Sequence, residues 1–248
     1  MSTLHPSITD SRAVLQQNLE RIQEQISCAA MRAHQSIPHI LAVTKTQPVA
    51  LVELAYSLGL RDFGENYVSE ALEKISALQL SVPNHQAVWH FIGPIQSNKT
   101  RLIAAHFDWA HGVDRLKIAQ RLSEQRGADL GCLQVCIQIN ISGEANKSGC
   151  APQEALALAL EVSHLPHLQL RGLMCVPAAL DADASFEARR APFDAMRDLF
   201  EQIRAALPQA HAAAFDTLSM GMSGDFEAAI GAGSTMVRIG SALFGARA

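Results

Sequence analysis

One lysine near the start of the chain could act as a nucleophile. Lys45 directly follows the apolar, β-branched residues 40–44, Ile-Leu-Ala-Val-Thr. If these residues form a strand, the alternation of side chains puts Lys45 on the same face as Leu41 and Val43. Apolar surroundings lower the pKa of a lysine, and a neutral amine forms imines with carbonyl compounds. The alternative is a strand-end lysine whose ammonium group reaches solvent.

Groups that suit a phosphate lie near the end of the sequence. Residues 218–225 (LSMGMSGD) and 236–241 (MVRIGS) combine serine hydroxyls, glycine backbone N–H groups and one arginine. Such donors bind phosphate well when they approach it closely. The candidates are Ser219, Ser223, Arg238, Gly240 and Ser241. The first segment is also typical of a helix N-terminus, with Ser223 as the capping residue.

Two further polar residues follow or lie within apolar runs. Asn66, after Phe-Gly-Glu, could donate from its amide to a ligand, or it could be a turn residue. His90, in Trp-His-Phe, is predicted to be a hydrogen-bonded core histidine rather than a catalyst. No GxGxxG segment follows a predicted strand, and the sequence has no Walker, HExxH or GxSxG motif.

The elements that would position these residues alternate along the chain. An opening helix is predicted over residues 10–34. Strands are then predicted at 39–46, 62–66, 88–94, 108–113, 133–142, 168–177, 215–223 and 235–244. The helical patterns between them cover about 49–59, 67–79, 97–106, 114–127, 152–164, 184–207 and 225–232.

Alternating strands and helices predict parallel strands with right-handed crossovers. Eight such units match a (β/α)8 barrel of the TIM type, here one domain over residues 1–248 with an extra N-terminal helix. An open doubly wound sheet is the alternative, but the first turn has no glycine. Barrel enzymes place their chemistry at the carboxyl ends of the strands. This rule selects Lys45, 65–66, 93–98, 140–148, 174–177, 219–223 and 238–241.

The composition limits the class of protein. With 248 residues, 48% hydrophobic and 18% charged, the chain has the composition of a folded protein. Its net charge of −4 gives no basic field for nucleic acid or an anionic membrane. No apolar stretch is long enough to span a bilayer, and residues 1–12 do not resemble a secretion signal. Five scattered cysteines with no CxxC pair indicate reduced thiols and a cytoplasmic protein.

The same segments also resemble a known family. The motifs LAVTKTQP (41–48), DFGENYVSEALEK (62–74), WHFIGPIQSNKT (89–100), QINISGEANKSG (138–149), RGLMCVP (171–177) and LSMGMSGDFEAAIGAGSTMVRIGSALFGAR (218–247) are similar to those of the YggS/PROSC family. Members of this family bind pyridoxal 5′-phosphate (PLP) and act in vitamin B6 homeostasis. The resemblance covers most of the chain, with its motifs in the same order.

The resemblance implies a barrel like the N-terminal domain of bacterial alanine racemase; the scattered cysteines separately predict no metal site. It assigns Lys45 as the Schiff-base lysine and Ser219, Gly240, Ser241 and, with less support, Ser223 as the phosphate site. Arg238 matches the arginine that faces the pyridine nitrogen, and Asn66 lies near the ring. An arginine there keeps this nitrogen unprotonated and weakens the ring as an electron sink.

Three functions are compatible with these residues. The first, which we expect, is a PLP homeostasis protein that is not an enzyme, is a monomer, and passes its cofactor to PLP-dependent apoenzymes. The second is a PLP enzyme acting on small amino acids, such as a racemase or lyase. The racemases that this chain resembles take an opposing tyrosine from a second domain, whereas Tyr56 and Tyr67 lie in early helical stretches. The third is a barrel for another phosphorylated metabolite.

Overall fold

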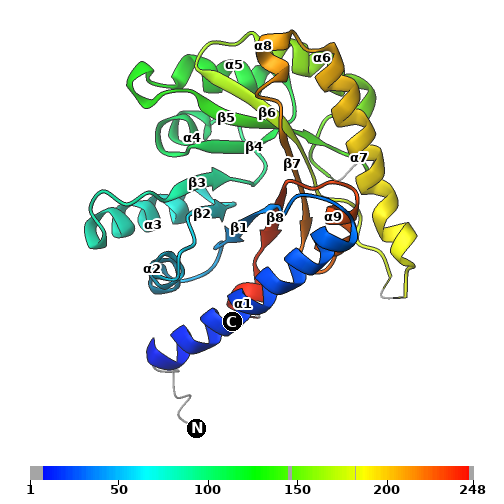
Figure 1. Cartoon of the computed structure of the whole chain (residues 1–248). Coiled ribbons are helices and arrows are strands. Elements are labelled where there is room, and N and C mark those ends of the chain that lie inside the picture. Colours follow the sequence, from blue (N-terminus) through cyan, green and yellow to red (C-terminus); the bar gives the residue numbers. More distant parts are fainter. Residues whose placement is uncertain (1–7, 145–146, 182, 246–248) are drawn as a thin grey trace.

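The chain forms a closed barrel of parallel strands surrounded by helices (Figure 1). The structure, a computed structural model, describes residues 8–144, 147–181 and 183–245. Within these residues eight strands pair in chain order, and β8 pairs in parallel with β1 to close the barrel. The predicted barrel is therefore confirmed, and the open doubly wound sheet is wrong.

The strands are short, and each begins near the predicted residue. They are β1 (His39–Val43), β2 (Asp62–Glu65), β3 (Val88–Phe91), β4 (Trp109–Val113), β5 (Leu133–Ile139), β6 (Leu168–Cys175), β7 (Thr217–Met222) and β8 (Met236–Ile239). The last prediction was wrong in part, because only the beginning of 235–244 is a strand. Ser241–Phe244 forms a short helix, α10, after Gly240.

The predicted helices are present with small changes at their ends. They are α1 (Ile8–Arg32), α2 (Val49–Ser57), α3 (Val68–Ser81), α4 (Thr100–His106), α5 (Leu116–Gln125), α6 (Pro152–Ser163), α7 (Phe186–Ala206) and α9 (Phe226–Gly231). The short helices η1 (Ala128–Leu130) and α8 (Gln209–Ala212) were not predicted. None of the helices in the described ranges is long and apolar enough to cross a membrane.

The two faces of the barrel wall differ in chemistry. Side chains that point outward, such as Phe63, Trp89 and Phe91, are buried against the helices in one hydrophobic cluster. Alternate side chains point into the barrel, and these include His90 and His111, which are both fully buried. Branched aliphatic residues usually fill a barrel of this kind. Here part of the interior is polar.

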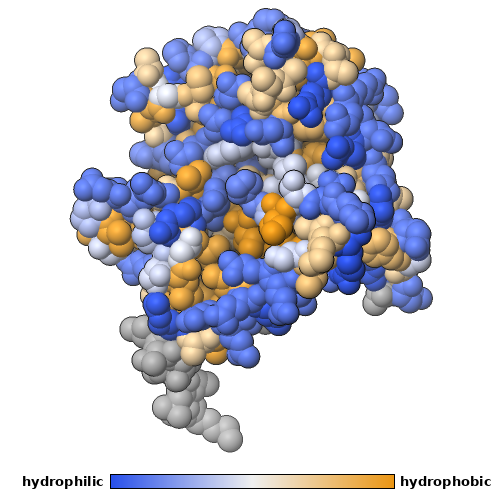
Figure 2. Space-filling model, in the orientation of Figure 1, coloured by the Kyte–Doolittle hydropathy of each residue, from blue (hydrophilic) through white to orange (hydrophobic). Residues whose placement is uncertain are grey.

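Helix α1 connects the beginning of the chain to its end. Leu15, Ile22 and Ile26 are buried on one side of this helix, which lies against α9 and α10. The amide of Asn18 donates to the carbonyl oxygen of Leu243 at 3.0 Å. The extra N-terminal helix thus supports the segment that carries Ser241. On the face seen in Figure 2, hydrophobic residues occur in small separate areas of a largely hydrophilic surface.

Candidate functional site

A cavity of about 570 Å³ lies at the carboxyl ends of the strands. This is the face of a parallel barrel where ligands bind. Its walls come from the ends of seven strands or the loops that follow them, that is, from every strand except β4. The lining residues are Val43, Lys45, Asn66, Ile92, Pro94, Gln138, Lys147, Ser148, Val176, Met222, Ser223, Gly224, Arg238, Gly240 and Ser241.

The charges around this cavity are of one sign. Lys45, Lys147 and Arg238 line it, and no aspartate or glutamate does so among the residues that the structure describes. Glu144 pairs with Lys147 from outside the lining, at 2.8 Å between Oε2 and Nζ. A cavity with three cationic side chains and no carboxylate favours an anionic ligand.

Lys45 is placed by strand β1. Leu41 is fully buried inside the barrel, and the alternation continues through Val43 to Lys45, which both line the cavity. The backbone leaves the strand here, since Thr46 has a positive φ of 63°. Lys45 is half-buried at the base of the loop into α2. The predicted position of its amine, above an apolar layer, agrees with this arrangement.

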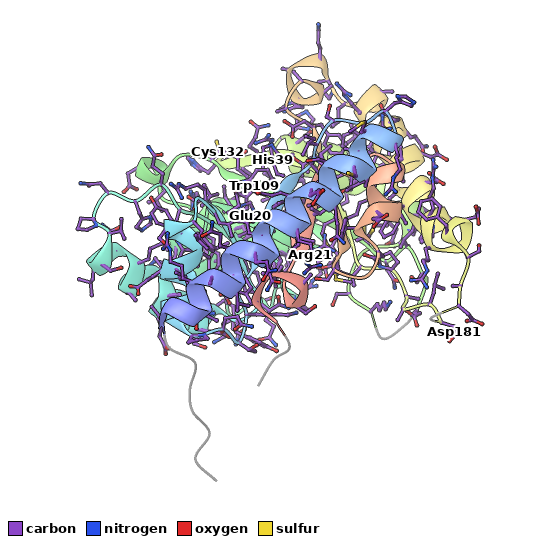
Figure 3. All side chains as sticks on the ribbon, turned by 60° about the horizontal axis from the view of Figure 1, so that its bottom comes forward. Glu20, Arg21, His39, Trp109, Cys132 and Asp181 are labelled. Carbon is purple, nitrogen blue, oxygen red and sulfur yellow. The ribbon has the colours of Figure 1, made fainter. Side chains whose placement is uncertain are left out.

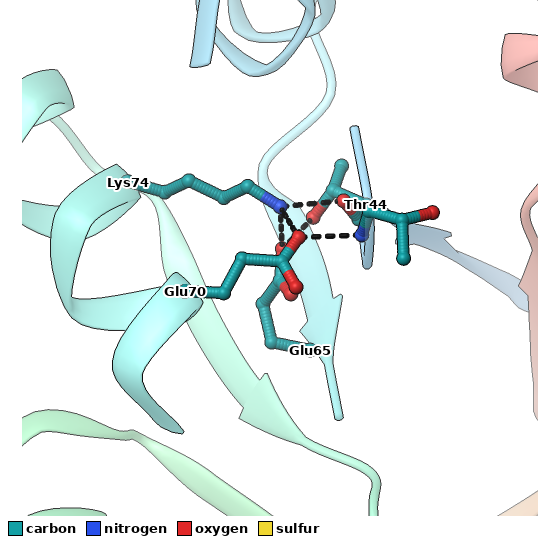
Figure 4. A network of polar contacts seen from close by, with 5 residues as sticks. Thr44, Glu65, Glu70 and Lys74 are labelled. Carbon is teal, nitrogen blue, oxygen red and sulfur yellow. Dashed lines mark hydrogen bonds and ion pairs between the residues drawn. The ribbon is translucent and has the colours of Figure 1, made fainter. Parts of the chain in front are cut away.

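A buried ion cluster behind the wall holds the residues on both sides of Lys45 (Figure 4). The Nζ atom of Lys74 donates to Oε1 of Glu65 at 2.7 Å, to Oε1 of Glu70 at 2.6 Å and to the carbonyl oxygen of Thr44 at 2.6 Å. The hydroxyl of Thr44 also donates to Glu65. One ammonium group therefore joins β1, β2 and α3.

The cluster reaches the residue after Lys45 as well. The backbone N–H of Thr46 donates to the Glu70 carboxylate. Burial raises the pKa of the Glu65 carboxyl, and the hydrogen bonds from Lys74 and Thr44 lower it again in part. Because the neighbours of Lys45 on both sides are tied to this cluster, its backbone is fixed before any ligand enters.

Arg238 is held under the cavity by acceptors from two other strands. Its side chain is buried, and Nη1 donates to the carbonyl oxygen and the hydroxyl of Ser219, the latter at 3.0 Å. Nη2 donates to the carbonyl oxygen of Cys175 at 2.7 Å. Burial lowers the pKa of Arg238, but a guanidinium stays protonated in proteins. Arg238 therefore presents a fixed donor to the cavity.

A turn after β7 brings serine and glycine donors to the cavity beside β8. Gly221 has a φ of 93°, and a Cβ atom on it would lie 2.6 Å from Cβ of Ala229. The register between β7 and β8 shifts at this position, as at a β-bulge. Met222 and Ser223 consequently both face the cavity.

Two contacts close this turn onto the end of the chain. The carboxylate of Asp225 accepts from the backbone N–H of Met222 at 2.6 Å, and Asp225 takes the N-cap position of α9. Ser223 does not cap that helix. Its hydroxyl accepts from the backbone N–H of Ala242 at 3.3 Å instead. Ser223, Gly224, Gly240 and Ser241 therefore lie together at one side of the cavity.

Ser219 lies elsewhere than expected. It is fully buried inside the barrel and does not line the cavity. Its hydroxyl is engaged by Arg238 and by Nδ1 of His111, which lies at 3.0 Å. The physical reason is its position in β7. Ser219 lies below the end of the strand, and the bulge at Gly221 interrupts the alternation of side chains between Ser219 and that end. The other six predicted residues all line the cavity.

Asn66 has a buried polar atom at the cavity wall. Among the residues that the structure describes, its Oδ1 atom finds no hydrogen-bond partner, and the residue lines the cavity. The loop after β3 packs directly on its backbone, since a Cβ atom on Gly93 would lie 2.6 Å from the Asn66 carbonyl oxygen. A fixed, unpaired amide at a cavity wall is a place for a ligand to hydrogen-bond.

Several functional residues were not singled out from the sequence. Gln138, Lys147 and Ser148 line the cavity. The sequence placed them in a motif at 138–149, and two of them at a strand end, without giving any of them a role. Lys74 gave no signal, because a lysine in an amphipathic helix is usually exposed. Neither Tyr56 nor Tyr67 lines the cavity. Tyr56 accepts a hydrogen bond from the backbone of Gln86, and Tyr67 is exposed.

The fold and the cavity define a class of protein, a parallel barrel with a lysine after its first strand and anion-binding groups after its last two. The profile of the alanine racemase N-terminal domain matches residues 17–248. The pyridoxal phosphate homeostasis protein of Pseudomonas aeruginosa is 52% identical over 237 residues, which cover 95% of this chain and 96% of that protein. The chain belongs to this family of pyridoxal phosphate homeostasis proteins.

Solved structures agree with this assignment. PipY of Synechococcus elongatus with PLP bound is 31% identical, with a TM-score of 0.78, covering 93% of this chain and 99% of PipY. Alanine racemase of Corynebacterium glutamicum is only 18% identical and shares the fold, with a TM-score of 0.67 over 95% of this chain and 62% of the racemase.

Proposed function

We propose that this protein binds PLP covalently through Lys45 and acts in PLP homeostasis. The observation that carries the proposal is the cavity itself, in which an amine faces phosphate-type donors and no described carboxylate intervenes. The volume of about 570 Å³ lies within the usual range for small-molecule sites. The name of the Pseudomonas aeruginosa relative and the PLP-bound structure of PipY support the same ligand.

The residues of the cavity fit the chemical groups of this cofactor. Ser223, Ser241 and the backbone N–H groups of Gly224 and Gly240 would hold the phosphate, because they lie together and carry no negative charge. The unpaired amide of Asn66 would hydrogen-bond the ring hydroxyl. Arg238 would donate to the ring nitrogen, and Ser219 would support Arg238 from below.

Lys45 would hold the cofactor reversibly. When bound, PLP supplies an aldehyde carbon to which an amine adds, with loss of one water and formation of a C=N bond. The role of the protein is to present the Lys45 side chain to the cavity that Arg238 and the serine and glycine donors also line. The ion cluster around Lys74 keeps the Lys45 backbone in place.

We infer that the protein holds and releases the cofactor rather than catalysing a reaction of amino acids. An arginine is always a donor, so it favours an unprotonated ring nitrogen and weakens the ring as an electron sink. In addition, no described tyrosine lines the cavity to serve as an opposing base. Delivery to PLP-dependent apoenzymes in the cytoplasm would follow, and the five unpaired cysteines suit that compartment.

A titration tests this proposal. Purified protein freed of cofactor is titrated with PLP, and with pyridoxal as a matched probe without phosphate, while the visible absorbance is followed. We expect saturable binding of PLP and much weaker binding of pyridoxal. The loaded protein should then restore activity to an apoenzyme that requires PLP. Equal binding of the two compounds would contradict the phosphate site, and no binding of either would contradict the function.

A further inference from the structure

A chain of hydrogen bonds runs through the barrel interior from the opposite face to Arg238. Asp62, at the start of β2, lies 3.0 Å from Nε2 of His90. Nδ1 of His90 lies 3.0 Å from Nε2 of His111, and Nδ1 of His111 lies 3.0 Å from the hydroxyl of Ser219. That hydroxyl accepts from Arg238. Five residues from five strands are thus joined in one line.

The far end of this chain opens to a second cavity. Asp62 lines a space of about 240 Å³ at the amino-terminal ends of the strands, together with His39, Trp109 and Arg171. Figure 3 labels His39 and Trp109, and His39 also lines a neighbouring space together with residues of α1. The Asp62 side chain is 31% exposed, whereas the His90 side chain is fully buried. The sequence prediction of a hydrogen-bonded core histidine at position 90 is confirmed.

The Asp62 carboxylate fixes the direction of every bond in the line when both imidazoles are neutral. A guanidinium is only a donor, and an ionised carboxylate is only an acceptor. A serine hydroxyl can accept twice, so the direction is set from the Asp62 end: in the neutral line Ser219 accepts from Arg238 and donates its proton to Nδ1 of His111. His111 in turn donates from Nε2 to Nδ1 of His90, and His90 donates from Nε2 to Asp62. In this arrangement each histidine carries a single proton, on Nε2.

The surroundings agree with two neutral histidines. Burial lowers the pKa of His90, although Asp62 and Asp108 oppose this effect. Burial lowers the pKa of His111 well below its usual value, and the neighbouring His90 and Arg238 lower it further. With His111 protonated on Nε2, a second proton on His90 would place two donors against each other at the contact between the two rings. Neutral imidazoles complete the line without an unsatisfied group.

We propose that Asp62, His90, His111 and Ser219 form a directed relay that positions Arg238 for the cofactor. In this relay Asp62 orients His90, His90 orients His111, and His111 turns a lone pair of Ser219 toward the guanidinium. Hydrogen bonds in such a line polarise one another, so the Asp62 carboxylate stabilises Arg238 from the opposite side of the barrel. Asp62 is then a positioning residue for a ligand that it does not contact. This inference deepens the proposed function and rests on it for the identity of the ligand.

The tautomers of the two histidines test the relay without any cofactor. Nitrogen-15 NMR of the cofactor-free protein should show His90 and His111 neutral and protonated on Nε2. Asp62→Asn replaces the acceptor by an amide that can also donate, so the tautomer populations should change. Ser219→Ala should change those of His111 even if Asp62→Asn does not fold. A proton on Nδ1 of either ring in the wild type would overturn the relay.

A double-mutant cycle tests whether Asp62 acts through Ser219. Asp62→Asn should weaken PLP binding about 2- to 30-fold in the wild-type background and have little effect in the Ser219→Ala background. Asp216→Asn is the control, because Asp216 lines the same second cavity as Asp62 but lies outside the relay. It should leave PLP affinity within about twofold.

Three outcomes separate the relay from the proposed function. An equal effect of Asp62→Asn in both backgrounds, or an equal effect of Asp216→Asn, would overturn the relay, and PLP binding by the wild type would still support the function. Wild-type protein that shows the expected tautomers but does not bind PLP would contradict the function and leave the hydrogen-bond direction established.

Discussion

In the proposed site, two residues carried by the neighbouring strands β1 and β8 would hold the ligand in different ways. Lys45 would supply the covalent bond, while Arg238 and the serine and glycine groups would supply hydrogen bonds. These contributions are physically separate, because one breaks with the C=N bond and the other depends on fixed donors. Substitutions at the two positions should therefore give different results.

Lys45→Ala should retain weaker, non-covalent PLP binding. The donors of Ser223, Gly240, Ser241 and Arg238 remain, so the phosphate and ring are still held, whereas the absorbance of the covalent linkage should disappear. Without cofactor, the free energy of unfolding should change by less than about 1 kcal/mol, since Lys45 is only half-buried. Equilibrium dialysis and urea unfolding measure the two effects. Affinity equal to that of the wild type would contradict a covalent role.

Arg238→Ala should weaken PLP binding about 10- to 100-fold, as expected for the loss of hydrogen bonds from a charged group. The structure adds a second effect. Arg238 is buried, so its removal leaves the carbonyl oxygens of Ser219 and Cys175 without this donor and should lower the free energy of unfolding by about 1–3 kcal/mol. Arg101→Ala, at an exposed position in α4, is the control. Unchanged affinity in the Arg238 variant would show that the guanidinium does not face the ligand.

The sequence predicted most of these residues, but not which serine faces the cavity. Alternation along β7 does not reveal a bulge, so it cannot distinguish Ser219 from Ser223 until the φ of Gly221 is known. Asp62, His90 and His111 could not be connected to Arg238 in advance. They lie on strands that come together only when the barrel closes.

At the level of the elements, β1, β2 and α3 are joined by the cluster around Lys74. This lysine and Glu65 are both buried, and a buried ion pair is strongly destabilising when one partner is removed. The amphipathic pattern of residues 67–79 predicted α3 correctly but gave no reason to place Lys74 inside. Its burial follows from the approach of α3 to the first two strands.

Lys74→Met should lower the free energy of unfolding by about 3–5 kcal/mol at neutral pH, because Glu65 stays buried without its partner. Lys117→Met, at an exposed position in α5, is the control and should change it by less than about 0.5 kcal/mol. Urea unfolding measures both. A loss no larger than that of the control would mean that the cluster does not stabilise the fold.

The decrease in the free energy of unfolding caused by Lys74→Met should also depend on pH. Burial raises the folded-state pKa of Glu65 above its ordinary value of 4.5, so the folded protein holds this proton more tightly than the unfolded chain. Stability from this group is therefore lost as pH rises from about 4.5 through the folded pKa. Lys74 lowers the pKa of Glu65, so Lys74→Met raises it further and enlarges the decrease in the free energy of unfolding as pH rises. The difference between the variant and the wild type should grow from pH 4.5 to 7, and a constant difference would contradict this origin.

The end of the chain shows where a sequence pattern fails to predict secondary structure. Residues 235–244 form one apolar run, and a short apolar run does not distinguish a strand from a turn of helix. The structure ends β8 at Ile239 and begins α10 at Ser241. This change places Gly240 and Ser241 at the cavity, where a continued strand would have carried them past it.

At the scale of the molecule, the barrel supplies a cofactor site without a described opposing base. We expect no steady racemisation of alanine, serine or lysine by the loaded protein, since Arg238 weakens the ring as an electron sink and neither tyrosine lines the cavity. Chiral chromatography after long incubation measures this. Product that increases in proportion to protein, and is absent with Lys45→Ala, would favour the alternative of a PLP enzyme.

The position of the covalent bond is the central claim, and borohydride reduction tests it most directly. The PLP-loaded protein is reduced, digested and analysed by mass spectrometry, with Lys45→Ala treated in parallel. We predict a reduced pyridoxyl group on Lys45 in the wild type and no labelled barrel peptide in the variant. Label on Lys147 or Lys99 in both proteins, with Lys45 unmodified, would contradict the assignment of the site to the end of β1.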